Sequence, residues 1–306
     1  MEKQIENKQA LTNAKDEERR VRITTQEAIE YREYKRQKKR AEILSAVANS
    51  EGILLDCEDE RKVRDNAMRL RQAAVCMSPE RLQSLGEAYL QKGIAVDCII
   101  GGNGETLAKV KAFEAKRAAR LKARELSLVL SPYAVLNNRY EEIAKEIKLV
   151  KRAAPKLLLK VRVNRAYNPT ILARLARISE GNGASYFCIP YHEGCERLKT
   201  ELKKGCKLQV DGVDDLAVFK KMHGAGVQRI VTTQAWEMYS AWMKEVEKIN
   251  FPELMSNAES VEIKQEIIKK KAVAAPLWLP IREPQKRLEA SVKEVEPQAI
   301  SVGGVK

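Results

Sequence analysis

Eight short aliphatic and β-branched runs alternate with longer amphipathic stretches between about residues 50 and 235. The runs cover residues 52–57, 73–79, 94–100, 126–132, 156–164, 185–190, 206–213 and 228–233. Strands that alternate with helices predict a parallel sheet, and eight is the number that closes a barrel. An open doubly wound sheet is the alternative, but no glycine-rich phosphate fingerprint follows the first run. We therefore predict an α/β fold, a (β/α)8 TIM-type barrel.

Both ends of the chain extend beyond this pattern. Thr24 followed by Glu27 forms a capping box, which predicts a long helix over residues 24–52 that stops near Gly52. After residue 250 we expect a helix near 257–273 and then a proline-containing tail. The predicted domains are an N-terminal helical extension (1–49), the barrel (50–250) and a C-terminal extension (251–306).

The net charge of +14 raises the question of nucleic acid. The densest basic run, residues 31–40, lies in helical sequence where Glu alternates with Lys and Arg, a pattern typical of a solvated helix face. No zinc-finger, RNA-recognition or helix-turn-helix pattern accompanies it. Weak attraction to polyanions is therefore expected, and a basic nucleic-acid-binding protein remains a secondary alternative.

The sequence gives no indication of a membrane segment or a secretory signal. No apolar run approaches the roughly 20 residues of a membrane helix, and the first residues contain no apolar core. The six cysteines show neither CxxC nor Cys/His spacing. We expect a cytoplasmic protein with reduced thiols, and neither a metal nor a cofactor is predicted.

The fifth strand carries the most informative side chains. Its odd-numbered positions are apolar and are expected to contact the helices: Leu157, Leu159, Val161 and Val163. Its even-numbered positions would face the barrel lumen: Leu158, Lys160, Arg162 and Asn164. Because an unpaired buried charge is costly, this pattern indicates a polar pocket. Asp56, at the carboxyl end of the first strand, could supply the opposite charge.

Several motifs resemble those of one enzyme family. "AAVCMSP" (73–79) contains Cys76, residues 109–131 contain Lys111 and the pair Glu114-Ala115, and "LLLKVRVN" contains Lys160. In this order and spacing, with Asp56 and residues 224–233, they resemble the deoxyribose-phosphate aldolases. These are Schiff-base lyases that join acetaldehyde to glyceraldehyde 3-phosphate. The resemblance covers about residues 50 to 245 and implies a lumen pocket lined by Cys76, Arg162, Asn164 and Cys188.

The resemblance is broken at the family's catalytic positions. Cys188 stands at the position of the imine-forming lysine, Leu208 at that of the second lysine and Ser127 at that of the proton-relaying aspartate. A thiolate cannot form an iminium. The family's phosphate loop is also altered, with Asp211 and Val231 in place of glycines and Asp214-Asp215 in place of Arg-Thr. An aspartate there opposes phosphate electrostatically.

Two functional interpretations follow. The first is a non-catalytic aldolase-like barrel with a structural, assembly or regulatory role. The second is a repurposed Schiff-base carbon–carbon lyase that acts on a small aldehyde or ketone, with Lys160 as the amine and Asp56 as the proton shuttle. In that case Arg162 would lower the pKa of Lys160 by repulsion. If Lys160 is merely ion-paired with Asp56, it stays protonated. His192, at the carboxyl end of the sixth strand, is either a general base or a solvent-facing loop histidine.

The C-terminal extension contains a candidate contact segment. Aromatic and aliphatic side chains flanked by arginine are typical of binding hot spots. The residues are Leu277, Trp278, Leu279 and Arg282. We therefore predict that the two extensions bind a protein partner or mediate self-assembly.

Overall fold

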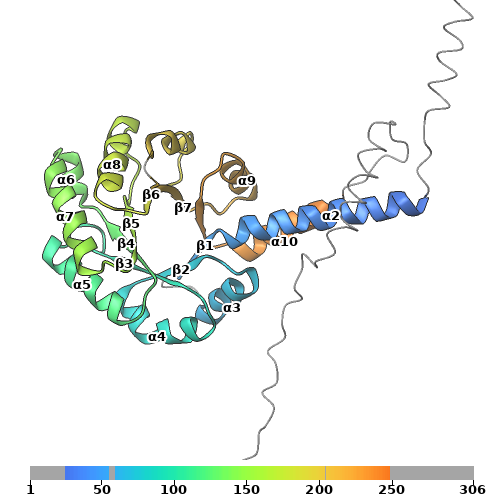
Figure 1. Cartoon of the computed structure of the whole chain (residues 1–306), viewed down its shortest axis with the longest axis horizontal. Coiled ribbons are helices and arrows are strands. Elements are labelled where there is room, and N and C mark those ends of the chain that lie inside the picture. Colours follow the sequence, from blue (N-terminus) through green and yellow to red (C-terminus); the bar gives the residue numbers. More distant parts are fainter. Residues whose placement is uncertain (1–24, 55–58, 204, 249–306) are drawn as a thin grey trace, which may run out of the picture. The chain divides into compact units, whose positions relative to one another are not determined.

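The computed structural model describes residues 25–54, 59–203 and 205–248. Eight parallel strands pair in sequence order, and β8 pairs with β1, so the sheet closes into a barrel (Figure 1). The strands are β1 (Glu51–Ile53), β2 (Ala74–Met77), β3 (Val96–Ile100), β4 (Glu125–Val129), β5 (Leu158–Arg162), β6 (Tyr186–Pro190), β7 (Lys207–Asp211) and β8 (Arg229–Thr232). The predicted TIM-type barrel is confirmed, and each strand lies within or overlaps its predicted range.

Helices connect the strands and surround the barrel (Figure 1). They are α3 (Glu60–Leu70), α4 (Pro79–Gln91), α5 (Ala108–Arg120), α6 (Pro132–Leu136), α7 (Tyr140–Ala153), α8 (Pro169–Gly181), α9 (Leu216–Gly224) and α10 (Ala235–Glu247). Between β6 and β7 the connection is only a 3₁₀ helix, η1 (Cys195–Glu201). This short connection helps to fit eight strands into fewer residues than the usual barrel.

Local sequence determines where several helices begin. Asp59, Ser78, Asn168 and Asp215 occupy N-cap positions, and their side chains accept hydrogen bonds from backbone N–H groups of the first turn. Pro stands in the first turn of α4 and α8, where its missing N–H costs nothing. Each of these helices therefore starts immediately after the strand or loop that precedes it.

The strands have two differently used faces. One face packs against the helices and forms the main hydrophobic core, to which Leu159, Val161 and Leu208 belong. The other face points into the lumen, which contains buried charged side chains such as Asp97 and Lys160. The predicted division of the fifth strand into an apolar and a polar face is thus confirmed.

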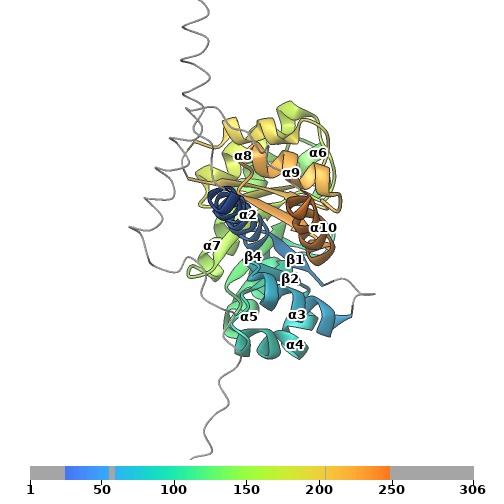
Figure 2. The same ribbon diagram turned by 90° about the vertical axis from the view of Figure 1, so that its right-hand side faces the viewer.

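The N-terminal helix α2 (Thr25–Ala48) differs from its predicted end. It stops at Ala48, and Gly52 lies within β1, where it pairs with Val75. α2 runs beside α10, as both views show (Figures 1 and 2). Arg36 Nη2 donates to the carbonyl of Glu247 at 3.3 Å, and Arg40 lies 3.8 Å from the same residue's carboxylate. Part of the basic run therefore contacts the chain's own last described helix.

The domain boundaries stay predictions. The barrel elements lie within residues 50–250, but residues 1–24 and 249–306 fall outside the described part of the chain, and so do Leu277, Trp278, Leu279 and Arg282. Within the described residues, every helix is too short or too polar to span a bilayer.

Candidate active site

A cluster of ionised side chains fills the centre of the lumen. Lys160 projects from β5, and its Nζ lies 2.6 Å from Glu125 Oε2 and 3.2 Å from Asp97 Oδ2. The ammonium also contacts Glu51 Oε2. Lys160, Glu51 and Asp97 are completely buried. One ammonium is therefore held by three carboxylates from β1, β3 and β4.

The three carboxylates keep Lys160 charged. Burial alone would lower the pKa of this ammonium, because desolvation disfavours the charged form. Attraction to Asp97, Glu51 and Glu125 outweighs that effect and raises the pKa of Lys160 well above its ordinary value. Arg229, which lies 2.7 Å from Glu125, adds a smaller opposing repulsion. In the resting protein Lys160 is an ammonium.

Glu51 and Asp97 are neighbours with opposite pKa shifts. Burial, with a smaller contribution from the Asp97 charge, raises the pKa of Glu51 to about 7. Burial also acts on Asp97, but Lys160 and hydrogen bonds from Glu51 and Ser127 lower its pKa to about 2. Asp97 accepts hydrogen bonds from more donors than Glu51 does, and it is therefore the ionised member of the pair. Glu51 is protonated below about neutral pH. Among the described residues, Glu51 Oε1 and Asp97 Oδ1 otherwise have no hydrogen-bond partner.

Asp97 links this cluster to the carboxyl end of the barrel. Ser127 Oγ donates to Asp97 Oδ2 at 2.6 Å, and the thiol of Cys76 donates to the same oxygen at 3.3 Å. Arg162, one layer further along, lies 2.8 Å from Asp211 Oδ2 and 3.5 Å from Ser127 Oγ. A continuous set of contacts therefore runs from Lys160 through Asp97 to Cys76.

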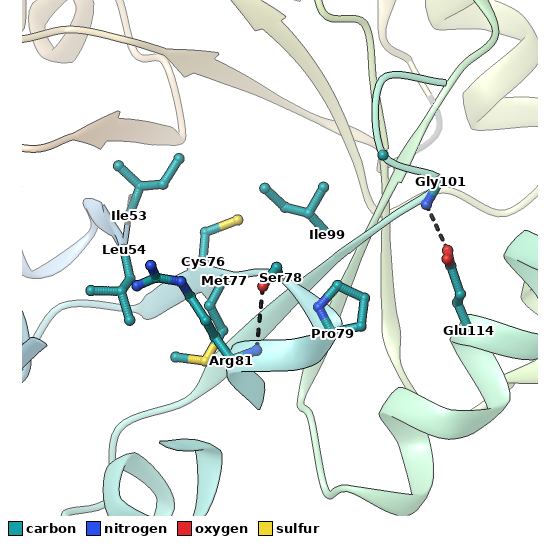
Figure 3. A pocket seen from close by; sticks show the side chains of 11 residues that line it. Ile53, Leu54, Cys76, Met77, Ser78, Pro79, Arg81, Ile99, Gly101 and Glu114 are labelled. Carbon is teal, nitrogen blue, oxygen red and sulfur yellow. Dashed lines mark hydrogen bonds between the residues drawn. The ribbon is translucent and has the colours of Figure 1, made fainter. Parts of the chain in front are cut away.

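A pocket of ≈ 310 Å³ opens at the carboxyl ends of β1 to β3 (Figure 3). Its apolar walls include Ile53, Leu54, Met77 and Ile99, and its polar lining includes Cys76, Ser78, Arg81 and Glu114. In Figure 3 the side chain of Cys76 lies between those of Ile53 and Ile99. Cys76 thus lines the pocket and contacts Asp97 on its other side. The amine of Lys160 does not line the pocket, and it is linked to Cys76 through Asp97.

The glycine-rich loop after β3 is held firmly beside the pocket. Gly101 donates its N–H to Glu114 Oε2 at 2.7 Å (Figure 3). Lys111 Nζ donates to the carbonyls of Gly104 and Val129 and lies 2.7 Å from Glu146. Gly104 has φ +94°, and a Cβ there would lie 2.1 Å from the carbonyl oxygen of Leu130. The pocket wall on this side is therefore fixed by both sterics and buried hydrogen bonds.

Five of the sequence-based site residues lie together. Cys76, Ser127, Lys160, Arg162 and Cys188 are brought together on the lumen face, as strand pairing and contacts show. Burial raises the pKa of the Cys188 thiol well above its ordinary value, so this cysteine is unsuited to act as a thiolate nucleophile.

Two other predicted residues lie away from the charged centre. Asn164 follows β5 and donates to the carbonyl of Asn103 at 2.9 Å, so it ties two loops at the carboxyl end. His192 Nδ1 lies 3.0 Å from the carbonyl of Pro190, outside the lumen cluster. Asp56, the predicted partner of Lys160, lies outside the described residues.

Leu208, which aligns with the family's second lysine, faces the helices and not the lumen. Leu208 belongs to the hydrophobic core against the helices, while its neighbour Gln209 pairs with Cys188 in the sheet. Gln209 Nε2 donates to Asp211 Oδ1 at 2.9 Å, which places its amide on the lumen side. Because side chains alternate along a strand, a one-residue error of register exchanges the two faces.

Sequence reasoning missed the partners of Lys160. Glu51, Asp97, Glu125 and Arg229 are all buried and close to the ammonium or to each other. A signal was present, because each of these charges stands in or beside an apolar strand run. An acidic residue in such a run needs a buried cation, and Lys160 was already assigned to the lumen.

One group of lumen residues offers metal-ligand atoms. Glu51, Cys76 and Asp97 present one ligand atom each, all within 4.8 Å of one another. However, the Lys160 ammonium already contacts both carboxylates, and Arg162 lies 3.8 Å from the Cys76 sulfur. The cations that balance these acids are therefore the chain's own side chains, and the set does not fit a divalent metal.

Comparison with known sequences identifies relatives of one kind. The chain is 27% identical over 187 residues to a deoxyribose-phosphate aldolase of Clostridioides difficile. That alignment covers 58% of this chain and 85% of the relative. It is 27% identical over 184 residues to the same enzyme of Aquifex aeolicus, covering 56% and 82%. A match to the Thermococcus kodakarensis enzyme is 36% identical over 110 residues, covering 35% of this chain and 49% of the relative.

Solved structures agree on the fold. An aldolase called QR15 superposes with a TM-score of 0.59 at 23% identity, covering 66% of this chain and 96% of that one. A deoxyribose-phosphate aldolase structure from Coccidioides immitis gives a TM-score of 0.60 at 21% identity, covering 65% and 86%. No model of a known protein family matches the chain.

These comparisons overturn one functional prediction. The interpretation as a non-catalytic barrel is contradicted, because the curated relatives are themselves named as aldolases and two of them match along more than four fifths of their length. Loss of the three family catalytic groups at Cys188, Leu208 and Ser127, together with the altered phosphate loop, was too narrow a basis for that interpretation. The lumen still contains a lysine amine and carboxyl groups with shifted pKa values.

Proposed function

Because the chain belongs to the deoxyribose-phosphate aldolase family, we propose that it is a carbon–carbon lyase acting on a small aldehyde or ketone. Lys160 is the proposed imine-forming amine. The observation that carries the proposal is the contact of this lumen lysine with Glu51, whose pKa is about 7. A carboxyl group that titrates near neutral pH beside an ammonium is suited to proton exchange with it.

The first chemical step requires a neutral amine. Above about pH 7 Glu51 is ionised and can accept a proton from the Lys160 ammonium. Because the pKa of Lys160 is raised well above its ordinary value, only a small fraction of the neutral amine forms at any time, and the substrate carbonyl must capture that fraction. The free amine then adds to the substrate carbonyl and forms a carbinolamine. Glu51 returns the proton to the departing hydroxyl, which leaves as water, and an iminium remains. Proton transfer within this pair therefore balances the condensation.

Carbon–carbon cleavage follows from the iminium. Glu51, ionised again after returning its proton, takes the proton of the substrate's β-hydroxyl group, a carbonyl forms there, and the bond between the α and β carbons breaks. The electron pair of that bond moves into the iminium and gives an enamine. Protonation and hydrolysis of the enamine release the second aldehyde or ketone and restore the lysine. In the synthetic direction the same steps run in reverse.

The pocket beside Cys76 supports a small substrate. Its apolar walls and volume of ≈ 310 Å³ suit a short carbon chain, and Cys76 stands between this space and the Asp97–Lys160 contact. Because Lys160 is completely buried, imine formation requires the side chains above it to move aside.

Borohydride trapping tests the assignment. The protein is incubated with acetaldehyde or 2-deoxyribose and borohydride, and the reduced adduct is located by peptide mass spectrometry. We expect it on Lys160 and expect Lys160→Arg to abolish it, because a guanidinium stays protonated while keeping the charge that the carboxylates require. Lys207→Arg, an exposed lysine on β7, is the matched control and should leave the adduct unchanged. An adduct that persists in Lys160→Arg, or none with either carbonyl compound, would overturn the proposal.

We also propose a cellular location and a mode of assembly. A cytoplasmic location is supported by the five described cysteines, which are all free and buried. Assembly through the C-terminal extension is supported only by its composition, and a chain ending at Asn250 tests it. That truncation should give a smaller species by light scattering with unchanged circular dichroism.

A further inference from the structure

The loops after β7 and β8 are the place where (β/α)8 barrels frequently bind phosphate, together with a helix N-terminus. Here the first loop runs over residues 212–215 and the second over residues 233–234, directly before α10. Backbone N–H groups at the start of a helix attract anions through hydrogen bonds and the helix dipole. The side chains that surround these N–H groups therefore decide whether a phosphorylated substrate is accepted.

One carboxylate already uses these donors. Asp214 Oδ1 accepts the N–H of Thr233 at 2.8 Å and the hydroxyl of Thr232 at 2.8 Å. The hydroxyl oxygen of Thr232 in turn accepts the N–H of Gln234 at 3.0 Å. An anion arriving at the start of α10 would have to displace Asp214 from two hydrogen bonds.

The charges around this position are also negative. Residues 211–216 contain three aspartates and no lysine or arginine, and residues 232–236 contain no charged residue. Arg162, a cation that reaches these loops, is already paired with Asp211 at 2.8 Å. Asp215 accepts the N–H of Val218 at 2.9 Å and caps α9. Nothing in these two loops offers a free positive charge to a phosphate dianion.

We propose that Asp214 is a specificity-determining residue that excludes phosphate monoesters, so that this barrel takes uncharged small aldehydes and ketones. The substrate class rests on the proposed function, whereas the exclusion of phosphate is a property of the binding surface and is measured without catalysis. Asp214 acts twice: its charge repels a dianion, and its oxygen takes the N–H and hydroxyl donors that a phosphate would need.

Phosphate binding is the direct test. Thermal melts are recorded at pH 7.5 in increasing sodium phosphate, with sodium chloride of equal ionic strength as the reference. We expect no phosphate-specific rise in Tm for the unaltered chain and a saturable rise for Asp214→Ser. Asp215→Ser is the matched control, because it removes the same charge from the next residue and leaves the Asp214 contacts in place. It should show no saturable rise.

Two outcomes would overturn the inference. One is a saturable, phosphate-specific rise in Tm of the unaltered chain. The other is a folded Asp214→Ser variant whose Tm shows no saturable, phosphate-specific rise. Asp214→Asn, which keeps the shape and removes the charge, serves if the serine variant does not fold, and it should bind phosphate better than the unaltered chain.

A second measurement connects the exclusion with the reaction. Borohydride trapping with 2-deoxyribose should exceed trapping with its 5-phosphate by at least about tenfold in the unaltered chain, and Asp214→Ser should narrow that ratio. Equal trapping of the two sugars by the unaltered chain would contradict the inference. Absence of any adduct would count against Lys160 chemistry but would leave the phosphate-binding result to stand by itself.

Discussion

Lys160 Nζ lies 3.2 Å from Asp97 Oδ2 in the middle of the barrel, and neither side chain has any exposed surface. The same aspartate oxygen accepts a hydrogen bond from the thiol of Cys76, and Cys76 lines the pocket at the carboxyl ends of the strands. This relationship places a lysine amine and a shared carboxylate one side chain below a substrate-sized space.

Lys160→Met should destabilise the protein strongly. Removal of the ammonium leaves Glu51, Asp97 and Glu125 without their common counter-charge, and breaking a buried pair typically costs about 3–5 kcal/mol. Lys160→Arg keeps a cation and should cost clearly less. Denaturant unfolding of both variants measures the difference. If Lys160→Met were as stable as the unaltered chain, the three carboxylates would not depend on this ammonium.

Glu51 should make stability depend on pH between about 4.5 and 7. The pKa of Glu51 is raised from 4.5 to about 7 in the folded protein, so over that interval the folded chain binds more protons than the unfolded chain. The contribution of Glu51 is fully present below about pH 4.5 and is lost as the pH rises through 7. Asp97, with a pKa lowered from 3.8 to about 2, acts in the opposite direction only below pH 4.

A Glu51→Gln variant tests this assignment. The amide cannot titrate, so the fall in Tm between pH 4.5 and 7 should become shallower than in the unaltered chain. Glu237→Gln, an exposed glutamate on α10, is the matched control and should leave the slope unchanged. An identical slope in the unaltered chain and Glu51→Gln would show that another group is responsible.

Gly104→Ala should disturb the loop beside the pocket. A Cβ at this position would lie 2.1 Å from the carbonyl oxygen of Leu130, and the φ of +94° is unfavourable for alanine. We expect a loss of at least about 2 kcal/mol in unfolding free energy. Gly102→Ala is the control, because its φ is +53° and its Cβ would meet nothing within 4 Å. Equal losses in the two variants would mean that close approach to Leu130 is not the cause.

The barrel was predictable because its signal is periodic. Alternating apolar runs and amphipathic stretches defined the eight strands, and the opposing faces of the fifth strand placed Lys160 and Arg162 in the lumen. The face of Leu208 was readable in the same way, because Leu208 and Val210 alternate with polar residues in the seventh strand. Alignment with the family's second lysine was followed there in place of this pattern. There a shift of one residue changes which side chain enters the lumen.

Local sequence marked the partners of Lys160 only as charges in or beside apolar strand runs, and it could not show which of them meet. Glu51, Asp97 and Glu125 lie 109, 63 and 35 residues from it along the chain, so only closure of the barrel brings them together. The pKa shifts have the same origin, since they depend on burial and on charges from other strands. Asp56 was the sequence-based choice because it stood alone at a strand end, whereas the described structure offers three buried carboxylates.

Cys76→Ala should make Lys160 easier to reach. The substitution removes the sulfur between the pocket and Asp97, so borohydride trapping on Lys160 should become faster at equal aldehyde concentration. The cost in stability should be about 1 kcal/mol. Cys98→Ala removes a buried thiol from β3 that packs in the hydrophobic core, and it should not accelerate trapping. A slower reaction in Cys76→Ala would assign the thiol a supporting role in place of a blocking one.

Enamine formation is the step that separates an aldolase from a barrel that merely contains a lysine. Exchange of the methyl hydrogens of acetaldehyde in D₂O, followed by proton NMR near pD 8, reports that step directly. The account predicts exchange well above the buffer rate with the unaltered chain, and exchange at the buffer rate with a folded Lys160→Arg variant. Exchange at the buffer rate with the unaltered chain, or equal acceleration by both proteins, would contradict it.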